Sequence, residues 1–85
     1  MWSTFVVPNN FIWDETRQKY TVTFPASTFE DYFTSDYDTY VVKAVRMDGE
    51  IYKPILCAWE VTETGDLTLL FDETFILRIT VSLSY

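Results

Sequence analysis

Carboxylates form the one cluster in this sequence whose residue types and spacing suit chemistry. Glu30, Asp31, Asp36 and Asp38 fall within a span of nine positions. Oxygen ligands at such short spacing suit calcium. The Asp-x-Asp-x-Asp-Gly frame and the later bidentate acid of a calcium-binding loop are missing, so solvated loop charge is the favoured interpretation. We therefore predict no metal site, with calcium binding as the alternative.

The other reactive side chains leave little for catalysis. The chain has no histidine, the commonest general base, which excludes Ser/His/Asp and Cys/His sites. Cys57, the only cysteine, lies beside Ala58 and Trp59 in an apolar stretch, where a thiol is usually buried and inert. Gly49 and Gly65 are the only glycines and both fall in turns, so no phosphate-binding loop is present. The sequence predicts a protein that is not an enzyme and takes no cofactor.

Aromatic rings offer a different kind of site, because Trp and Tyr rings can stack on sugars. Aromatic residues make up 19% of the chain. We expect Trp13, Tyr37 and Tyr52 to be exposed, whereas Trp2 and Trp59 lie on strands. Carbohydrate binding is therefore one alternative function.

Net charge and hydrophobicity limit the kinds of partner. A formal net charge of −7 opposes contact with phosphate backbones, so we predict no nucleic-acid partner. A small acidic inhibitor that imitates nucleic acid, for example an anti-defence protein, is a second alternative. No apolar run is long enough to cross a membrane. With 48% hydrophobic residues, the 85-residue chain has more apolar surface than one small domain hides, which favours a homo-oligomer or a docked partner.

Alternation with a period of two predicts strands in most of the chain. They are expected over residues 2–7, 19–24, 39–47, 50–61, 67–71 and 74–85. Turn residues such as Pro8-Asn9-Asn10 separate these runs. Ser27-Thr28-Phe29-Glu30 has the form of a capping box and predicts one short helical turn. The pattern is that of an all-β fold, a small antiparallel β-sandwich of about six strands, forming one domain over residues 1–85.

Phe11-Ile12-Trp13 places three large apolar residues beside a turn. We interpret them as a plug for one end of the core, with an exposed aromatic contact surface as the alternative.

Asp48-Gly49 between two apolar runs predicts a tight type I′ hairpin. With these two residues as the loop, Met47 faces Glu50. Pro54 has no N–H, which predicts that its strand lies at a sheet edge or contains a bulge.

The predicted register sorts the hairpin's side chains onto two faces. The face chosen as core carries Val42, Ile55, Cys57 and Trp59, with Val42 opposite Ile55 and Tyr40 opposite Cys57. On the other face Val41 opposes Leu56 and Val45 opposes Tyr52. This second face needs cover, either from this chain or from another.

The last apolar run indicates how the fold closes. Phe75, Leu77, Ile79 and Val81 fall on every second residue and predict one buried face. Phe71 also points inward, and a two-residue hairpin loop would set it opposite Thr74. The connection is therefore either a hairpin loop of odd length or an arch that carries the chain from one sheet to the other. An odd loop usually takes glycine at its αL position and none is present here, so we favour the arch. Ile76 and Arg78 leave the outer face less polar than a free surface, which predicts an interface there.

Four stretches carry a resemblance to a known class of protein. They are residues 2–10, the Asp48-Gly49-Glu50-Ile51 hairpin leading to Pro54, residues 66–71 and residues 79–83. Together they resemble the small β-sandwich modules of tailed-phage virion proteins, found in fibres, appendages and capsid accessories. The resemblance covers roughly the second half and the first strand. Such modules often have a glycine near the last strand junction, where this chain has Asp72-Glu73-Thr74.

The resemblance implies a non-enzymatic virion component, made in the host cytoplasm and often repeated around a symmetry axis. It transfers no functional residues. We expect a structural or adaptor protein of a bacteriophage particle that binds other virion proteins and copies of itself. The predicted partner-binding residues are Trp13, Tyr37, Val41, Val45, Tyr52, Leu56, Ile76 and Arg78.

Overall fold

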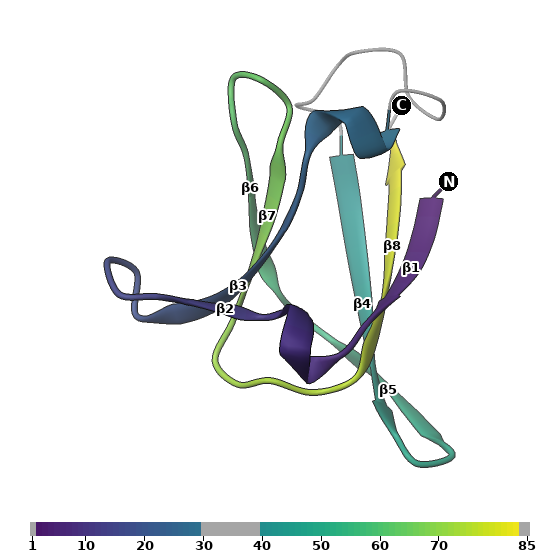
Figure 1. Ribbon diagram of the computed structural model, residues 1–85. Coiled ribbons are helices and arrows are strands. Elements are labelled where there is room, and N and C mark those ends of the chain that lie inside the picture. Colours follow the sequence, from purple (N-terminus) through teal and green to yellow (C-terminus); the bar gives the residue numbers. More distant parts are fainter. Residues whose placement is uncertain (1, 30–39, 84–85) are drawn as a thin grey trace.

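Two four-stranded antiparallel sheets face each other in the computed structural model, which describes residues 2–29 and 40–83 (Figure 1). Sheet 1 has the order β1 (Trp2–Val6), β8 (Leu77–Leu83), β4 (Tyr40–Asp48) and β5 (Ile51–Ile55). Sheet 2 has the order β2 (Ile12–Asp14), β3 (Lys19–Phe24), β7 (Leu67–Phe71) and β6 (Ala58–Val61). The predicted all-β antiparallel sandwich is confirmed.

Short 3-10 turns join some of these strands. They are η1 (Pro8–Asn10) and η2 (Ala26–Phe29). The predicted helical turn is therefore present as η2, while Glu30 of the expected capping box lies outside the described residues. The described part of the chain contains eight strands rather than six, because β2 was not predicted and the run over residues 50–61 divides in two.

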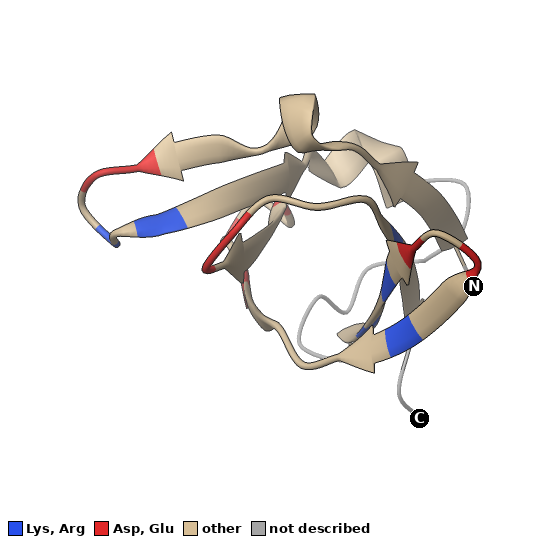
Figure 2. Cartoon of the chain, turned by 90° about the horizontal axis from the view of Figure 1, so that it is seen from below, with Lys and Arg blue, Asp and Glu red and all other residues tan. Residues whose placement is uncertain are grey.

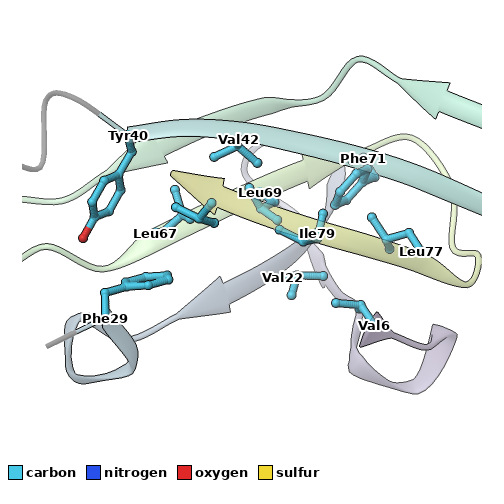
Figure 3. Packing of buried hydrophobic residues seen from close by; sticks show 12 residues of the cluster. Val6, Val22, Phe29, Tyr40, Val42, Leu67, Leu69, Phe71, Leu77 and Ile79 are labelled. Carbon is cyan, nitrogen blue, oxygen red and sulfur yellow. The ribbon is translucent and has the colours of Figure 1, made fainter. Parts of the chain in front are cut away.

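The core is built from the inward faces of the two sheets (Figure 3). Alternate residues of β8, namely Leu77, Ile79 and Val81, are fully buried, as the period of two predicted. From β7, Leu67 and Leu69 meet them from the opposite sheet. Both strands are interior to their sheets, which explains why they carry the most deeply buried side chains.

Aromatic side chains close the two ends of the core. At one end Phe29 of η2 packs edge-on against Trp2, with ring centroids 5.1 Å apart, and against Tyr40 at 5.4 Å. At the other end Phe11 lies 5.4 Å from Phe71. Both ring clusters cover apolar strand residues that the sheets alone would leave exposed.

The predicted arch between the last two strands is confirmed. Phe71 ends β7 in sheet 2, and β8 begins at Leu77 in sheet 1. Phe75 packs against the core within the connection. The strand therefore starts three residues later than the predicted Thr74.

The hairpin between β4 and β5 has a different register from the predicted one. Asp48 pairs with Ile51 and Met47 with Tyr52, so Gly49 and Glu50 form the loop. Among the described residues near this turn only Gly49 has a positive φ, 64°. A type II′ turn takes glycine at its first central position, which explains why Asp48 stays in the ladder.

The two-residue shift changes every predicted partner but not the faces. Val45 pairs with Pro54, so the expected Val45–Tyr52 pair is wrong. Val41 pairs with Ser82 of β8 rather than with Leu56, and Tyr40 pairs with Leu83 rather than with Cys57. Ala44, not Val42, pairs with Ile55. The chosen core face holds nevertheless, because Tyr40, Val42 and Ala44 are all buried.

The run over residues 50–61 changes sheets at Leu56 and Cys57. Pro54 does lie on an edge strand, as its missing N–H predicted. Trp59 pairs with Leu69 in sheet 2 but is 39% exposed, so the prediction that it belongs to the core is wrong. Because β6 is an edge strand, no further strand covers that ring.

Candidate functional site

The outward face of sheet 1 carries a row of large side chains across all four strands. Phe5 pairs with Arg78, Arg78 with Val45, and Val45 with Pro54. Directly paired residues share a face of the sheet, so these four lie side by side. They point away from the core because their strand neighbours, such as Val42 and Ala44, point into it.

The neighbouring pair Met47 and Tyr52 extends this row toward the hairpin tip. The six residues line a groove of about 300 Å³, which we call the outer groove. Phe5 and Tyr52 are among the most exposed large apolar residues of the described chain. A contiguous exposed apolar patch of this kind marks an interaction surface more often than scattered single residues do.

Arg78 is the one charged residue among the described residues that line the outer groove. The other two arginines are ion-paired: Arg17 lies 3.1 Å from Asp14 and 2.6 Å from Glu60, and Arg46 pairs with Glu73. Within the part of the chain that the structure describes, Arg78 has no ion pair. An unpaired guanidinium beside apolar side chains is a ready partner for a carboxylate from another molecule.

Basic and acidic residues are divided unequally between the sheets (Figure 2). The described segments that form sheet 1, residues 2–6, 40–55 and 77–83, contain four basic residues and two acidic ones, while those that form sheet 2, residues 12–24 and 58–71, contain two basic and five acidic ones. Lys43 and Arg78 are the charged residues among the outward-pointing strand positions of sheet 1. The outer face of sheet 1 is therefore positive in a chain whose total charge is negative.

Three of the eight predicted partner-binding residues line the outer groove, namely Val45, Tyr52 and Arg78. Ile76 lies at the border, where its carbonyl oxygen accepts a hydrogen bond from the Met47 N–H at 2.9 Å. Val41 shares the outward face but lies farther along β4, opposite Ser82.

The remaining three predicted residues lie elsewhere. Leu56 is fully exposed at the point where the chain changes sheets. Trp13 is exposed on β2 in sheet 2, with its ring edge-on to Tyr20 at 4.9 Å. Tyr37 lies outside the described residues.

Sequence reasoning missed three residues of the groove: Phe5, Met47 and Pro54. Phe5 could have been predicted, because neighbouring residues of a strand point to opposite faces and Val6, the next residue, is buried. Met47 was placed opposite Glu50 by the wrong hairpin register.

A second pocket of about 350 Å³ lies at the junction of the sheets. Its apolar lining includes Leu56, Cys57 and Phe75, and the ion pair of Lys19 with Asp72 borders it. Cys57 supplies the one thiol among the described residues that line it, and desolvation by burial raises the pKa of this thiol above the ordinary 9.0. Because the reactive form is the thiolate, this pocket is poorly suited to nucleophilic chemistry.

We expect Cys57 to react slowly with a thiol reagent such as DTNB. At pH 8 the folded protein should react several-fold more slowly than the protein in denaturant, because burial lowers both access and the thiolate fraction. Because the pKa of Cys57 is higher in the folded state than in the unfolded state, the protonated thiol contributes to the free energy of unfolding. This contribution is fully present below pH 9 and is lost as the pH rises through the pKa of the folded state. Reaction at equal rates in both states would contradict the burial of this thiol. The variant Cys57→Ser has no thiol and therefore measures the background signal of the reagent.

The described residues also bear on metal binding and on membrane insertion. In residues 2–29 and 40–83, no group of three or more His, Cys, Asp or Glu residues is placed to hold a metal ion. The carboxylates at positions 30–38 that suggested calcium lie outside this part. None of the helical segments described is long and apolar enough to span a membrane.

The two alternative functions depend on an acidic face and on an aromatic platform. A nucleic-acid mimic would carry Glu30, Asp31, Asp36, Asp38, Glu63 and Asp66 on one face, and of these only Glu63 and Asp66 are described. Asp66 accepts a hydrogen bond from the Ala26 N–H at 2.9 Å. The exposed Trp13 forms an edge-on pair with Tyr20, not a flat platform for a sugar ring.

The chain was also compared with protein-family models, with curated proteins and with solved structures, and no significant match was found in any of the three comparisons.

Proposed function

We propose that this chain is a non-enzymatic binding module that acts through protein–protein contacts, as a structural or adaptor component of a bacteriophage particle. The observation that carries the proposal is the outer groove, an apolar surface across all four strands of sheet 1. The phage assignment rests on the resemblance of the sequence to virion β-sandwich modules.

The composition of the outer groove supports a protein as its occupant. Interface centres are rich in Tyr, Phe, Met and Arg, and the groove contains one of each. The groove is formed by the outer face of sheet 1. An exposed aromatic and aliphatic surface with one arginine suits another folded chain.

We take the occupant of the outer groove to be a second copy of this chain. The positive outer face of sheet 1 complements the acidic segments of sheet 2, so one copy can meet the next head to tail. A repeated subunit of a particle uses this kind of contact. Other virion proteins would bind at the remaining surfaces.

Light scattering coupled to size exclusion tests the proposal directly. The wild-type protein is expected to form oligomers whose mass increases with concentration and decreases with salt, since Arg78 contributes to an exposed charge contact. Tyr52→Asp should raise the dissociation constant at least about tenfold, because a groove tyrosine of this kind is worth on the order of 2 kcal/mol.

Ile51→Asp is the matched control. Ile51 is the neighbouring residue on β5, is similarly exposed, and lies outside the outer groove. It should leave the oligomer unchanged. Equal effects of the two variants would remove the outer groove from the interface, and a protein that stays monomeric at millimolar concentration would rule out the second copy as occupant.

A further inference from the structure

The four edge strands of the sandwich differ in how they are protected against pairing with another chain. β5 contains Lys53 and Pro54, which both discourage strand addition. β2 has three residues and ends in Asp14, and β6 has four and contains Glu60. β1 has five residues with neither a charge nor a proline. It is therefore the edge least protected by its sequence.

The outward backbone groups of β1 have almost no partners in the described chain. An edge strand pairs through alternate residues and leaves the other N–H and C=O groups pointing outward. Among residues 2–29 and 40–83, the one hydrogen bond to this strand's backbone outside the β1–β8 ladder runs from the Thr4 hydroxyl to the Phe5 carbonyl oxygen, at the long distance of 3.5 Å. A strand that added here would find free donors and acceptors.

A slot of about 320 Å³ lies beside this edge, between the two sheets. On the sheet 1 side Thr4 and Val6 line it, and on the sheet 2 side Val22 and Phe24 do. Ile12, which pairs with Thr21 and is well exposed, lines its outer border. None of the described residues that line it is charged. β2 pairs only with the first half of β3, so the second half of β3 also borders the opening without a neighbouring strand. The slot, which we call the edge slot, has room for apolar side chains.

We propose that β1 accepts an extended segment of a different protein by β-strand addition. The segment's backbone pairs with the outward groups of β1, and its alternate apolar side chains enter the edge slot. Its other face lies beside Phe5 on the outer side of sheet 1, where the unpaired Arg78 favours an acidic side chain. This inference rests on the proposed function as a protein-binding module and names the second partner and its chemistry.

The edge slot is the reason for choosing a single segment over a second copy. If β1 of one copy paired with β1 of another, each strand would turn its inner side chains toward its own core, where Val6 is already buried. The slot would then stay unfilled. A single extended strand has one face free, and only such a strand can place side chains in the slot.

A short capped peptide in which valine alternates with glutamate is the probe. NMR hydrogen exchange on the full chain should show slower exchange at alternate amides of β1 when the peptide is added. Strand addition predicts this alternation, whereas docking on a face protects no regular pattern. The same peptide with lysine in place of glutamate should bind more weakly, because Arg78 would then repel it.

Ile12→Asp tests the slot, with Ile51→Asp as the matched control. Both isoleucines are well exposed, 69% and 59%, so both variants should fold, with a small loss of stability at Ile51 because the new carboxylate lies opposite Asp48. Only Ile12 lines the edge slot. Ile12→Asp should weaken binding of the valine–glutamate peptide at least about tenfold.

Phe5 and Arg78 border both the outer groove and the proposed peptide site, so peptide binding is compared at a protein concentration at which the wild type is monomeric. There Tyr52→Asp, which is expected to reduce oligomer mass at high concentration, should leave peptide binding unchanged, so this inference and the outer groove can fail separately.

Three results would overturn the inference. The first is no alternating protection of β1 at millimolar peptide. The second is equal peptide binding by Ile12→Asp and Ile51→Asp. The third is alternating protection without peptide that grows with protein concentration, since it would place a second copy on this edge.

Discussion

Replacing Leu77 or Ile79 with aspartate is expected to unfold the protein. Both side chains are 0% exposed and lie on β8, which pairs with β1 on one side and β4 on the other. An unpaired charge at such a site costs on the order of several kcal/mol, and a small domain has only about 5–15 kcal/mol of stability in total. Far-UV circular dichroism and thermal melting would show the loss of the cooperative transition.

Ile76→Asp is the matched control for these two variants. Ile76 immediately precedes β8 and is 46% exposed, so a charge there stays hydrated. The variant should melt cooperatively, and it should weaken self-association because Ile76 borders the outer groove through Met47. If Ile76→Asp unfolds the chain, or if Leu77→Asp keeps a wild-type melting curve, the inner and outer faces of this strand have been assigned wrongly.

Phe29→Ala should have the second largest effect on stability. Phe29 is 1% exposed and packs edge-on against Trp2, Phe24 and Tyr40, with centroid distances of 5.1, 6.4 and 5.4 Å. Truncating a buried phenylalanine costs about 3–5 kcal/mol, because apolar contacts are lost and a cavity is left. Urea unfolding followed by tryptophan fluorescence would measure this loss as a lower midpoint.

Phe5→Ala provides the comparison for the same chemical change on the surface. Phe5 is 62% exposed, and so its truncation should alter the unfolding free energy by less than about 0.5 kcal/mol. A loss at Phe5 as large as that at Phe29 would mean that the outer face of sheet 1 is part of the core.

Alternation predicted the all-β fold well because it reflects burial on one side of a strand. Leu77, Ile79 and Val81 are buried as expected, and the arch before them followed from two phenylalanines that could not face each other across a short hairpin. These features depend on local phase, which the sequence contains.

Alternation did not predict where the chain passes from sheet 1 to sheet 2, because every second residue still points to the core through this crossing. Ile55 and Cys57 pack against the same core although β5 ends at the first and β6 begins after the second. The period of two therefore runs through the break unaltered. Only the fully exposed Leu56 marks the change, and an exposed leucine cannot be recognised from sequence alone.

The outer groove could be predicted in part for the same reason. Its face was identified, because shifting the hairpin register by two residues leaves every side chain on its original side. The individual neighbours were wrong, since a type II′ turn at Gly49 and a type I′ turn at Asp48-Gly49 fit the same dipeptide. The edge slot could not be predicted, because it depends on how far β2 extends along β3.

The position of β8 between β1 and β4 has a consequence for the rate of folding. Trp2 pairs with Val81, so sheet 1 joins segments almost the whole sequence apart. Closing such a long loop lowers the conformational entropy of the chain before the stabilising contacts of the sheet have formed. In sheet 1 the β4–β5 hairpin is the part that local contacts can form. The other two pairings, β1 with β8 and β4 with β8, cannot form until β8 is in place. We expect high contact order and folding on the order of milliseconds to seconds, slow for 85 residues.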